Sequence, residues 1–201
     1  MMELVVRDLE KFYDGNAVLS GVSFTACAGL TRIAGSSGIG KTTLLRILLG
    51  LEAPDGGTSN GSDFRWAAVF QENRLLEGLD AEENLRFVLG AAYDAAAAQT
   101  LLAELGLGSV GKKKVRDYSG GMKRRLALAR ALLAPCDALA LDEPFTGLDD
   151  ENRSIALSCI LRAAEDKIVL LATHDALALP EGCKTVTLQR SMPRQAGLTG
   201  A

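Results

Sequence analysis

The stretch "GSSGIGKTT" at residues 35–43 constrains the fold of this chain more than any other segment. A short apolar run at 30–34 leads directly into it. After it, apolar residues recur at the i, i+3, i+4, i+7 spacing of one buried helix face: Leu44, Ile47, Leu48 and Leu51. Glycines let successive backbone N–H groups turn toward one anion, and the positive end of a following helix dipole adds to that attraction. The segment therefore predicts a strand, an anion-binding loop and a helix.

The loop also matches the pattern G-x-x-x-x-G-K-[ST] through Gly35, Gly40, Lys41 and Thr42. In the strand-to-helix context this pattern predicts a site for a nucleoside triphosphate. Lys41 can reach the β- and γ-phosphates, and Thr42 Oγ1 can hold Mg²⁺. The predicted nucleotide-binding residues of the loop are Gly35, Ser36, Ser37, Gly38, Ile39, Gly40, Lys41, Thr42 and Thr43.

A second segment, "ALALDEPFTGLD" at 138–149, supplies carboxylates at the end of an apolar strand. Asp142 is placed to bind Mg²⁺, directly or through water. Glu143 follows it and can orient or deprotonate an attacking water, a role typically worth about 10²–10⁴ in rate. The alternative is a charged exit from a strand into a loop, and the phosphate loop upstream favours the catalytic interpretation.

Two further polar residues stand at the ends of apolar runs. His174, the only histidine, follows "IVLLAT" at 168–173, and open α/β sheets bind ligands at such strand ends. We expect His174 to contact the γ-phosphate or the attacking water, although a lone histidine is more often structural. Gln71 ends the run "WAAVF" at 66–70 and gains significance only from the neighbouring motifs.

The remaining pattern predicts a single domain over residues 1–201. Strands are expected at 3–7, 18–26, 30–34, 66–70, 138–141, 168–173 and 185–188. The unbroken apolar runs among them are typical of parallel strands covered on both faces. Between about 72 and 117, Ala and Leu dominate, which predicts an inserted helical subdomain with helices near 80–90 and 94–105, capped by Asp80 and Asp94. Another helix is expected from 119 to about 134, and a frayed tail at 190–201.

Composition narrows the class of protein. The chain has 201 residues, 48% of them hydrophobic and 23% charged, with a net charge of −3, so no broad positive field attracts nucleic acid. The one basic run, at 112–114, is interpreted as a solvated loop. The four cysteines form no CxxC pair, which favours reduced thiols over a disulfide frame or a zinc site. Because no window approaches 18 uninterrupted apolar residues, the chain is expected to reach a membrane only through a partner.

A second phosphate-binding turn raises the question of why one chain carries two. In "YSGGMKRR" at 118–125, Ser119 can cap a helix, and the glycines expose N–H groups at its positive end. Taken in order, "GSSGIGKTT", "VFQE", "YSGGMKRR", "LALDEPFTGLD" and "ATHD" resemble the ATP-binding subunit of an ABC transporter over nearly the whole chain. The resemblance implies that Ser119, Gly120 and Gly121 bind the γ-phosphate held by the other subunit of a dimer, so that each turn serves a different ATP.

The same resemblance implies the fold: an α/β P-loop NTPase core with a mostly parallel central sheet, an N-terminal antiparallel β-subdomain and an inserted helical subdomain. It also implies roles for single residues. Tyr13 would stack on adenine, with Phe12 as the alternative. Gln71 would sense and bind Mg²⁺, Asp149 would link the two sites across the dimer, and His174 would act as the switch histidine.

The activity and partners follow from the resemblance as expectations. The chain would hydrolyse ATP with Mg²⁺ as a head-to-tail dimer with itself or a paralogous subunit. It would drive a separate membrane permease from the cytoplasmic face of the membrane, with or without an extracytoplasmic substrate-binding protein. Its helical segment after Gln71 would receive the permease. "SGGM", "VFQENRLL" and "LDEPFTGLD" resemble importers of the nitrate, sulfonate and taurine type.

Two other functions are weighed against the transporter. One is a soluble ABC ATPase that acts in assembly or repair, and the other is an ATP-dependent dimerisation module with little turnover. Glu143 and His174 argue against the second of these. A GTPase is disfavoured because the chain has no NKxD motif.

The chain also departs from the family pattern. Met122 replaces the usual Gln of the signature turn, and Arg32 is unexpected in the strand before the phosphate loop. The short span from Lys41 to Gln71 predicts that a β-subdomain strand near 58–62 is trimmed. No regulatory domain is expected after the final strand.

Overall fold

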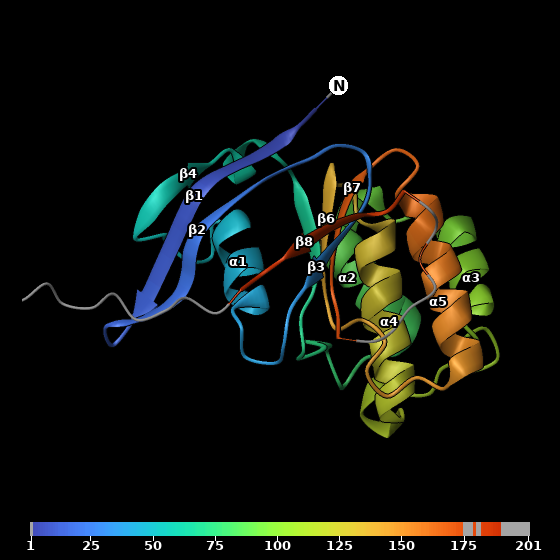
Figure 1. Cartoon of the computed structure of the whole chain (residues 1–201). Coiled ribbons are helices and arrows are strands. Elements are labelled where there is room, and N and C mark those ends of the chain that lie inside the picture. The colour runs from blue at the N-terminus through green and yellow to red at the C-terminus, as the bar shows by residue number, and fades with distance from the viewer. Residues whose placement is uncertain (1, 175–178, 180–181, 190–201) are drawn as a thin grey trace, which may run out of the picture.

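The computed structural model describes residues 2–174, 179 and 182–189, so the predicted tail at 190–201 lies outside the described residues. Within them, strands form two sheets (Figure 1). The strands are β1 (Leu4–Tyr13), β2 (Asn16–Ala26), β3 (Gly29–Ala34), β4 (Gly56–Ser59), β5 (Trp66–Val69), β6 (Ala138–Asp142), β7 (Ile168–Ala172) and β8 (Lys184–Thr187). The helices are α1 (Lys41–Leu48), α2 (Ala81–Leu89), α3 (Ala95–Glu104), α4 (Gly120–Leu133) and α5 (Asp150–Ala163).

The larger sheet has the order β5-β6-β7-β3-β8, and all its strand pairs are parallel. The smaller sheet, β2-β1-β4, is antiparallel. This arrangement confirms the predicted parallel core with an N-terminal antiparallel β-subdomain. The strand expected to be trimmed near 58–62 is present as the four-residue β4, in which Ser59 pairs with Val6 of β1.

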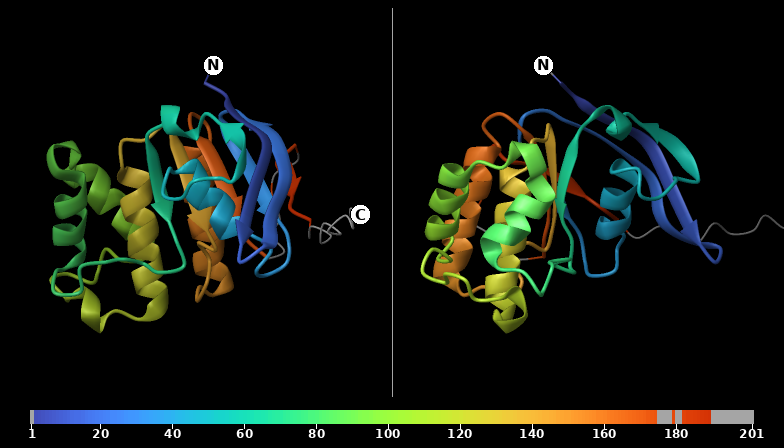
Figure 2. Two further views of the ribbon diagram at one scale, coloured as in Figure 1. Left: turned by 90° about the vertical axis from the view of Figure 1, so that its left-hand side faces the viewer. Right: turned by 180° about the vertical axis from the view of Figure 1, so that it is seen from behind.

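Two apolar layers cover the parallel sheet. On one face α1 lies between the two sheets, and on the other face α2 to α5 gather beside the sheet (Figures 1 and 2). Successive side chains of β6 point to opposite faces of the sheet. Ala138 and Ala140 pack in the apolar layer on the α1 side, whereas Leu139 and Leu141 pack in the layer that contains the other helices. Burial on both faces explains why β6 and β7 read as continuous apolar runs.

Helix boundaries follow local capping. Asp80 and Glu83 form a capping box at α2, and Asp94 accepts hydrogen bonds from the first turn of α3, as predicted. Ser119 caps α4 by accepting from Met122 N at 3.2 Å. Helix α5 was not predicted. Its periodicity is weak, and the sequence signal that marks its start is Asp149, which caps it.

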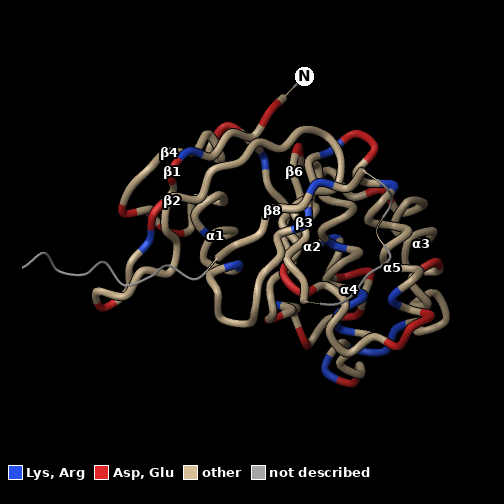
Figure 3. The backbone as a smooth tube through the Cα atoms, viewed as in Figure 1, with Lys and Arg blue, Asp and Glu red and all other residues tan. Residues whose placement is uncertain are grey.

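Acidic and basic positions are mixed along the backbone, and several of both kinds lie near the lower end of α4 (Figure 3). The predicted basic loop at 112–114 contacts acidic residues of α2. Lys112 pairs with Glu82 at 3.3 Å and Lys114 with Glu83 at 2.9 Å, so the first turn of α2 neutralises much of the run. Across the part of the chain that the structure describes, no helix is long and apolar enough to span a membrane. All four cysteines are free thiols.

Candidate nucleotide-binding and catalytic site

The predicted phosphate loop joins β3 to α1 in a form that requires glycine. Gly40, directly before α1, has a φ of 110°, in the region that side chains disfavour. A Cβ at Gly40 would lie 2.9 Å from Val18 Cγ1 of β2. The loop therefore packs against the antiparallel sheet at a distance that only glycine allows.

Lys41 holds its ammonium group over this loop. Its Nζ donates to the carbonyl oxygens of Gly35 at 2.9 Å and Ser36 at 3.2 Å, and it lies 3.9 Å from Glu143 Oε1. The side chain is 7% exposed, so its charge is only weakly screened by solvent. The loop thus presents a fixed positive charge and a helix N-terminus to the same space, and these features fit a triphosphate.

Asp142 ends β6 beside the phosphate loop. Thr42 Oγ1 donates to Asp142 Oδ2 at 2.5 Å. Burial raises the pKa of Asp142, the Thr42 hydrogen bond lowers it, and the charge of Glu143 raises it further. A hydroxyl and a carboxylate in contact are ligands that suit Mg²⁺, and a bound cation would favour the ionised carboxylate. Thr42 and Asp142 are therefore two of the residues that could hold the metal, and Gln71 lines the same cavity.

Glu143 lies in a constrained turn after β6. Its φ is 49°, and its backbone N donates to Ala172 O at 2.8 Å. Its carboxylate accepts from Thr173 Oγ1 at 3.1 Å and from His174 N at 3.2 Å, and His174 Nδ1 lies 2.9 Å from Oε1. The His174 side chain remains 67% exposed. The Glu143 carboxylate is thus oriented from the end of β7, and the Thr173 contact was missed by the sequence analysis.

A cavity of about 280 Å³ brings the predicted cis residues together. Its lining comprises Tyr13, Val18, Ser37, Gly38, Gly40, Lys41, Thr42, Thr43, Gln71, Asp142 and Glu143. Phe12, the alternative to Tyr13, is not among these lining residues.

The Tyr13 ring is held from two sides by residues that the sequence analysis did not select. Its hydroxyl donates to Glu52 Oε1, and Lys11 Nζ lies 5.5 Å from the ring centroid. The Glu52 hydrogen bond is the main cause that raises the pKa of Tyr13. With 41% of its surface exposed, the ring is available for stacking against a base.

The second phosphate-binding turn lines a different hollow, of about 400 Å³. Its lining comprises Ser119, Gly120, Gly121, Arg125, Gly147, Leu148, Asp149 and Asn152. Gly121 packs tightly here, because an added Cβ would lie 2.9 Å from Gly147 O. Asp149 accepts from Asn152 N at 2.8 Å, and this bond lowers the pKa of its carboxyl group. The two hollows have no lining residue in common.

Residues 19–146 match the protein family described as "ABC transporter". The chain belongs to the ABC transporter family. An aliphatic sulfonates import ATP-binding protein from Pseudomonas savastanoi is 37% identical over 85% of this chain and 73% of its own length. A protein of the same name from Rhizobium johnstonii is 40% identical over 83% of this chain and 66% of its own length.

Solved structures of the ABC transporter family agree with the fold. An ATP-binding subunit of an ABC transporter superimposes with a TM-score of 0.82 at 27% identity, covering 94% of this chain and 87% of its own. A bacterial Atm1-family ABC exporter shares the fold with a TM-score of 0.80 at 20% identity over 94% of this chain and 37% of its own. The predicted ABC ATPase fold is therefore confirmed.

As a member of the ABC transporter family, the chain is an ATP-binding subunit that hydrolyses ATP in support of transport, as predicted. Its relatives are subunits of transport systems, which does not favour the alternative of a soluble assembly or repair ATPase. Subunits of this kind work as dimers with a membrane permease.

Proposed function

We propose that two subunits dimerise head to tail and enclose two ATP molecules, each between the phosphate loop of one subunit and the Ser119 turn of the other. The observation that carries this proposal is the separation of the two phosphate-binding elements into hollows with no shared lining residue. In Figure 1 the N-terminal ends of α1 and α4 both face downward, and they lie at different places across the view. A second copy is therefore needed to complete each site. The second copy is this chain or a paralogous subunit.

Within one composite site we assign roles from the geometry. Tyr13 stacks on the adenine, and residues 35–43 bind the phosphates. Thr42, Asp142 and Gln71 line one cavity and would hold Mg²⁺, which would neutralise phosphate charge. Glu143 removes a proton from the attacking water, while His174 contacts the γ-phosphate. Asp149 lies beside the Ser119 turn and links the two sites across the dimer.

Mixed dimers that combine Ser119→Asp with Lys41→Ala test the head-to-tail arrangement. Aspartate preserves the helix cap, so the fold is kept, but its negative charge repels a phosphate at this position. With the two changes on opposite subunits, both fall in one composite site, and we expect about half of the wild-type hydrolysis from the other site. With both changes on one subunit, each composite site is damaged and hydrolysis should be lost. The reverse pattern would contradict the head-to-tail dimer.

We further propose that the transport direction is import. The named relatives import aliphatic sulfonates, so alkanesulfonates are the first cargo to test. The proposed assembly contains a permease that anchors the subunit to the cytoplasmic face of the membrane and an extracytoplasmic binding protein. Affinity purification of the chain from gently solubilised membranes should recover a multi-span permease in near-stoichiometric amount. Recovery from the soluble fraction alone would contradict this proposal.

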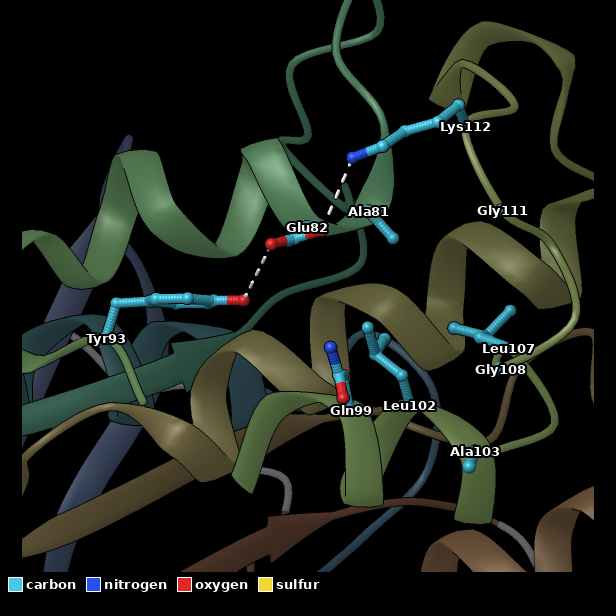
Figure 4. A pocket seen from close by; sticks show the side chains of 10 residues that line it. All are labelled: Ala81, Glu82, Tyr93, Gln99, Leu102, Ala103, Leu107, Gly108, Gly111 and Lys112. Atoms are coloured by element: carbon cyan, nitrogen blue, oxygen red, sulfur yellow. Dashed lines mark hydrogen bonds and ion pairs between the residues drawn. The ribbon is translucent and has the colours of Figure 1, made fainter. Parts of the chain in front are cut away.

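An exposed apolar face on α2 supports a docking site for an intracellular helix of the permease. Phe87 is 70% exposed and Val88 is 50% exposed, and they are adjacent on this helix. Helix α2 also borders a hollow of about 430 Å³ that it shares with α3 (Figure 4). There Glu82 accepts hydrogen bonds from Tyr93 and Lys112. Phe87 and Val88 do not line this hollow, so they form a separate exposed apolar surface. We place the permease contact on that face, in the predicted helical subdomain at 72–117.

Phe87→Glu is expected to abolish transport and membrane recovery while leaving the ATPase activity of the isolated subunit within about twofold. The reason is that an exposed charge on α2 removes apolar contact with the permease, whereas surface substitutions change stability little. The matched control is Met2→Glu, which changes another exposed apolar residue, 57% exposed, before β1. Transport at the wild-type rate with Phe87→Glu, measured in proteoliposomes, would place the permease contact elsewhere.

A further inference from the structure

Arg124 is a buried cation within the segment 118–125, and no role was predicted for it from the sequence. It lies on α4, five residues after Ser119, and is 3% exposed. Its guanidinium group forms hydrogen bonds with two turns that come from distant parts of the sequence. One is the turn that carries Gln71 after β5, and the other is the turn that carries Glu143 after β6.

The two ends of the guanidinium divide these contacts. Nη1 donates to Phe70 O, to Asn73 Oδ1 at 3.1 Å and to Gln71 O at 3.4 Å. Nη2 donates to Asp142 O at 2.6 Å and to Glu143 O at 2.5 Å. A planar fork of this kind can bridge two groups of carbonyls, whereas the ammonium of lysine is a single point of donation.

The arrangement is electrostatically demanding. Among the described residues, no carboxylate pairs with Arg124 in an ion pair or hydrogen bond, and every acceptor but one is a backbone carbonyl. Burial lowers the pKa of its guanidinium, and the charges of Asp142 and Glu143 oppose that change. Because a buried charge without a direct partner is costly, a core residue of similar volume would serve packing better. We therefore explain the presence of Arg124 by the two turns that it positions rather than by a contribution to the stability of the fold.

Glu143 is the residue most sensitive to this support. Its backbone is in the left-handed region at a φ of 49°, which a non-glycine residue keeps only when its surroundings hold it there. Its carbonyl accepts from Arg124 and its N–H donates to Ala172 O. Loss of the Arg124 bond would let the turn relax and shift the carboxylate.

We propose that Arg124 is a positioning residue that holds the Gln71 and Glu143 turns in a fixed relation and fastens both to the helix that begins beside Ser119. In the head-to-tail dimer, on which this part of the inference rests, contact between Ser119 and the partner's ATP is thereby connected to the catalytic turn of its own subunit. The catalytic effect of Arg124 falls on the site formed by its own phosphate loop.

Steady-state hydrolysis by the full-length Arg124→Met variant tests the positioning role. We expect kcat to fall by about 10- to 100-fold, because a misplacement of about 1 Å at a catalytic group can cost about 10²-fold. The KM for ATP should stay within about threefold, since the phosphate loop is untouched. Arg124→Lys keeps the charge but not the fork and should also be impaired. The control, Arg130→Met, removes an α4 arginine whose hydrogen bonds among the described residues reach one turn alone, at Asn73 O and Arg74 O, and not the Glu143 turn. Because the two turns stay joined by Arg124, kcat should change by less than about threefold.

The inference would be overturned by a kcat within twofold of wild type for Arg124→Met, by full activity of Arg124→Lys, or by a raised KM with kcat unchanged. If Arg124→Met fails to fold, Arg124→Gln replaces it, because its amide can reach one turn but not both. Assays are run below the measured melting temperature of each variant. A loss of activity equal to the fraction of unfolded protein would also count against the positioning role.

Mixed dimers distinguish this inference from the proposed function. Arg124→Met and Lys41→Ala on the same subunit damage one site, so the second site should remain active. Placed on opposite subunits, they damage both sites, and hydrolysis should fall by about 10- to 100-fold. This pattern is the reverse of that expected for Ser119→Asp. If Ser119→Asp behaves as a cis change while Arg124→Met still lowers kcat, the head-to-tail proposal fails and the positioning role stands.

Discussion

Glu143→Gln is expected to reduce ATP hydrolysis by about 10²–10⁴-fold, the typical contribution of a positioned general base. Glutamine has nearly the same shape, so the Thr173 contact at 3.1 Å can be kept, but it cannot take a proton from water. Binding of ATP should persist because Lys41 and the phosphate loop are unchanged. Since ATP is bound and not consumed, the dimer should accumulate. Phosphate release and size-exclusion chromatography with ATP and Mg²⁺ measure both effects.

The matched control is Glu151→Gln, which makes the same chemical change at an exposed position of α5. It should hydrolyse ATP at a rate close to wild type. Normal turnover in Glu143→Gln would show that another group activates the water. Equal losses in the two variants would point to a general effect of charge rather than to a base.

Lys41→Ala is expected to weaken ATP binding by about 10²-fold. A hydrogen bond to a charged group contributes about 1.5–3 kcal/mol, and a loss of about 2.7 kcal/mol corresponds to a hundredfold change in Kd. Lys41 is the buried cation at the mouth of the phosphate loop, and its Nζ is only 2.9 Å from Gly35 O. Titration with a fluorescent ATP analogue measures the affinity directly.

Arg46→Met provides the control for this substitution. It removes one positive charge from the same helix, but Arg46 is exposed, so its charge is screened by solvent. The affinity of this variant should stay within about threefold of wild type. If Lys41→Ala also binds ATP with wild-type affinity, the phosphate-loop assignment is wrong.

Strong local signals made several elements predictable from the sequence. The glycine loop and the helix after it follow from the spacing of glycines and apolar residues, and the caps at Asp80, Asp94 and Ser119 lie at the predicted helix starts. Elements with weak local signals were harder to predict. Helix α5 buries few residues, and β4 is the sequence "GGTS", whose strand form depends on backbone hydrogen bonds to β1.

The sequence by itself determined which chemical groups this protein has and where each begins or ends an element, because loops, caps and apolar periodicity are local properties of the chain. Tertiary structure alone decided which groups meet. It placed Tyr13, Lys41 and Glu143 around one cavity and the Ser119 turn in another. It also brought Arg124 to Gln71 and Glu143, contacts that span 53 and 19 residues. No local pattern encodes such contacts, since they depend on how parallel strands order themselves in the sheet.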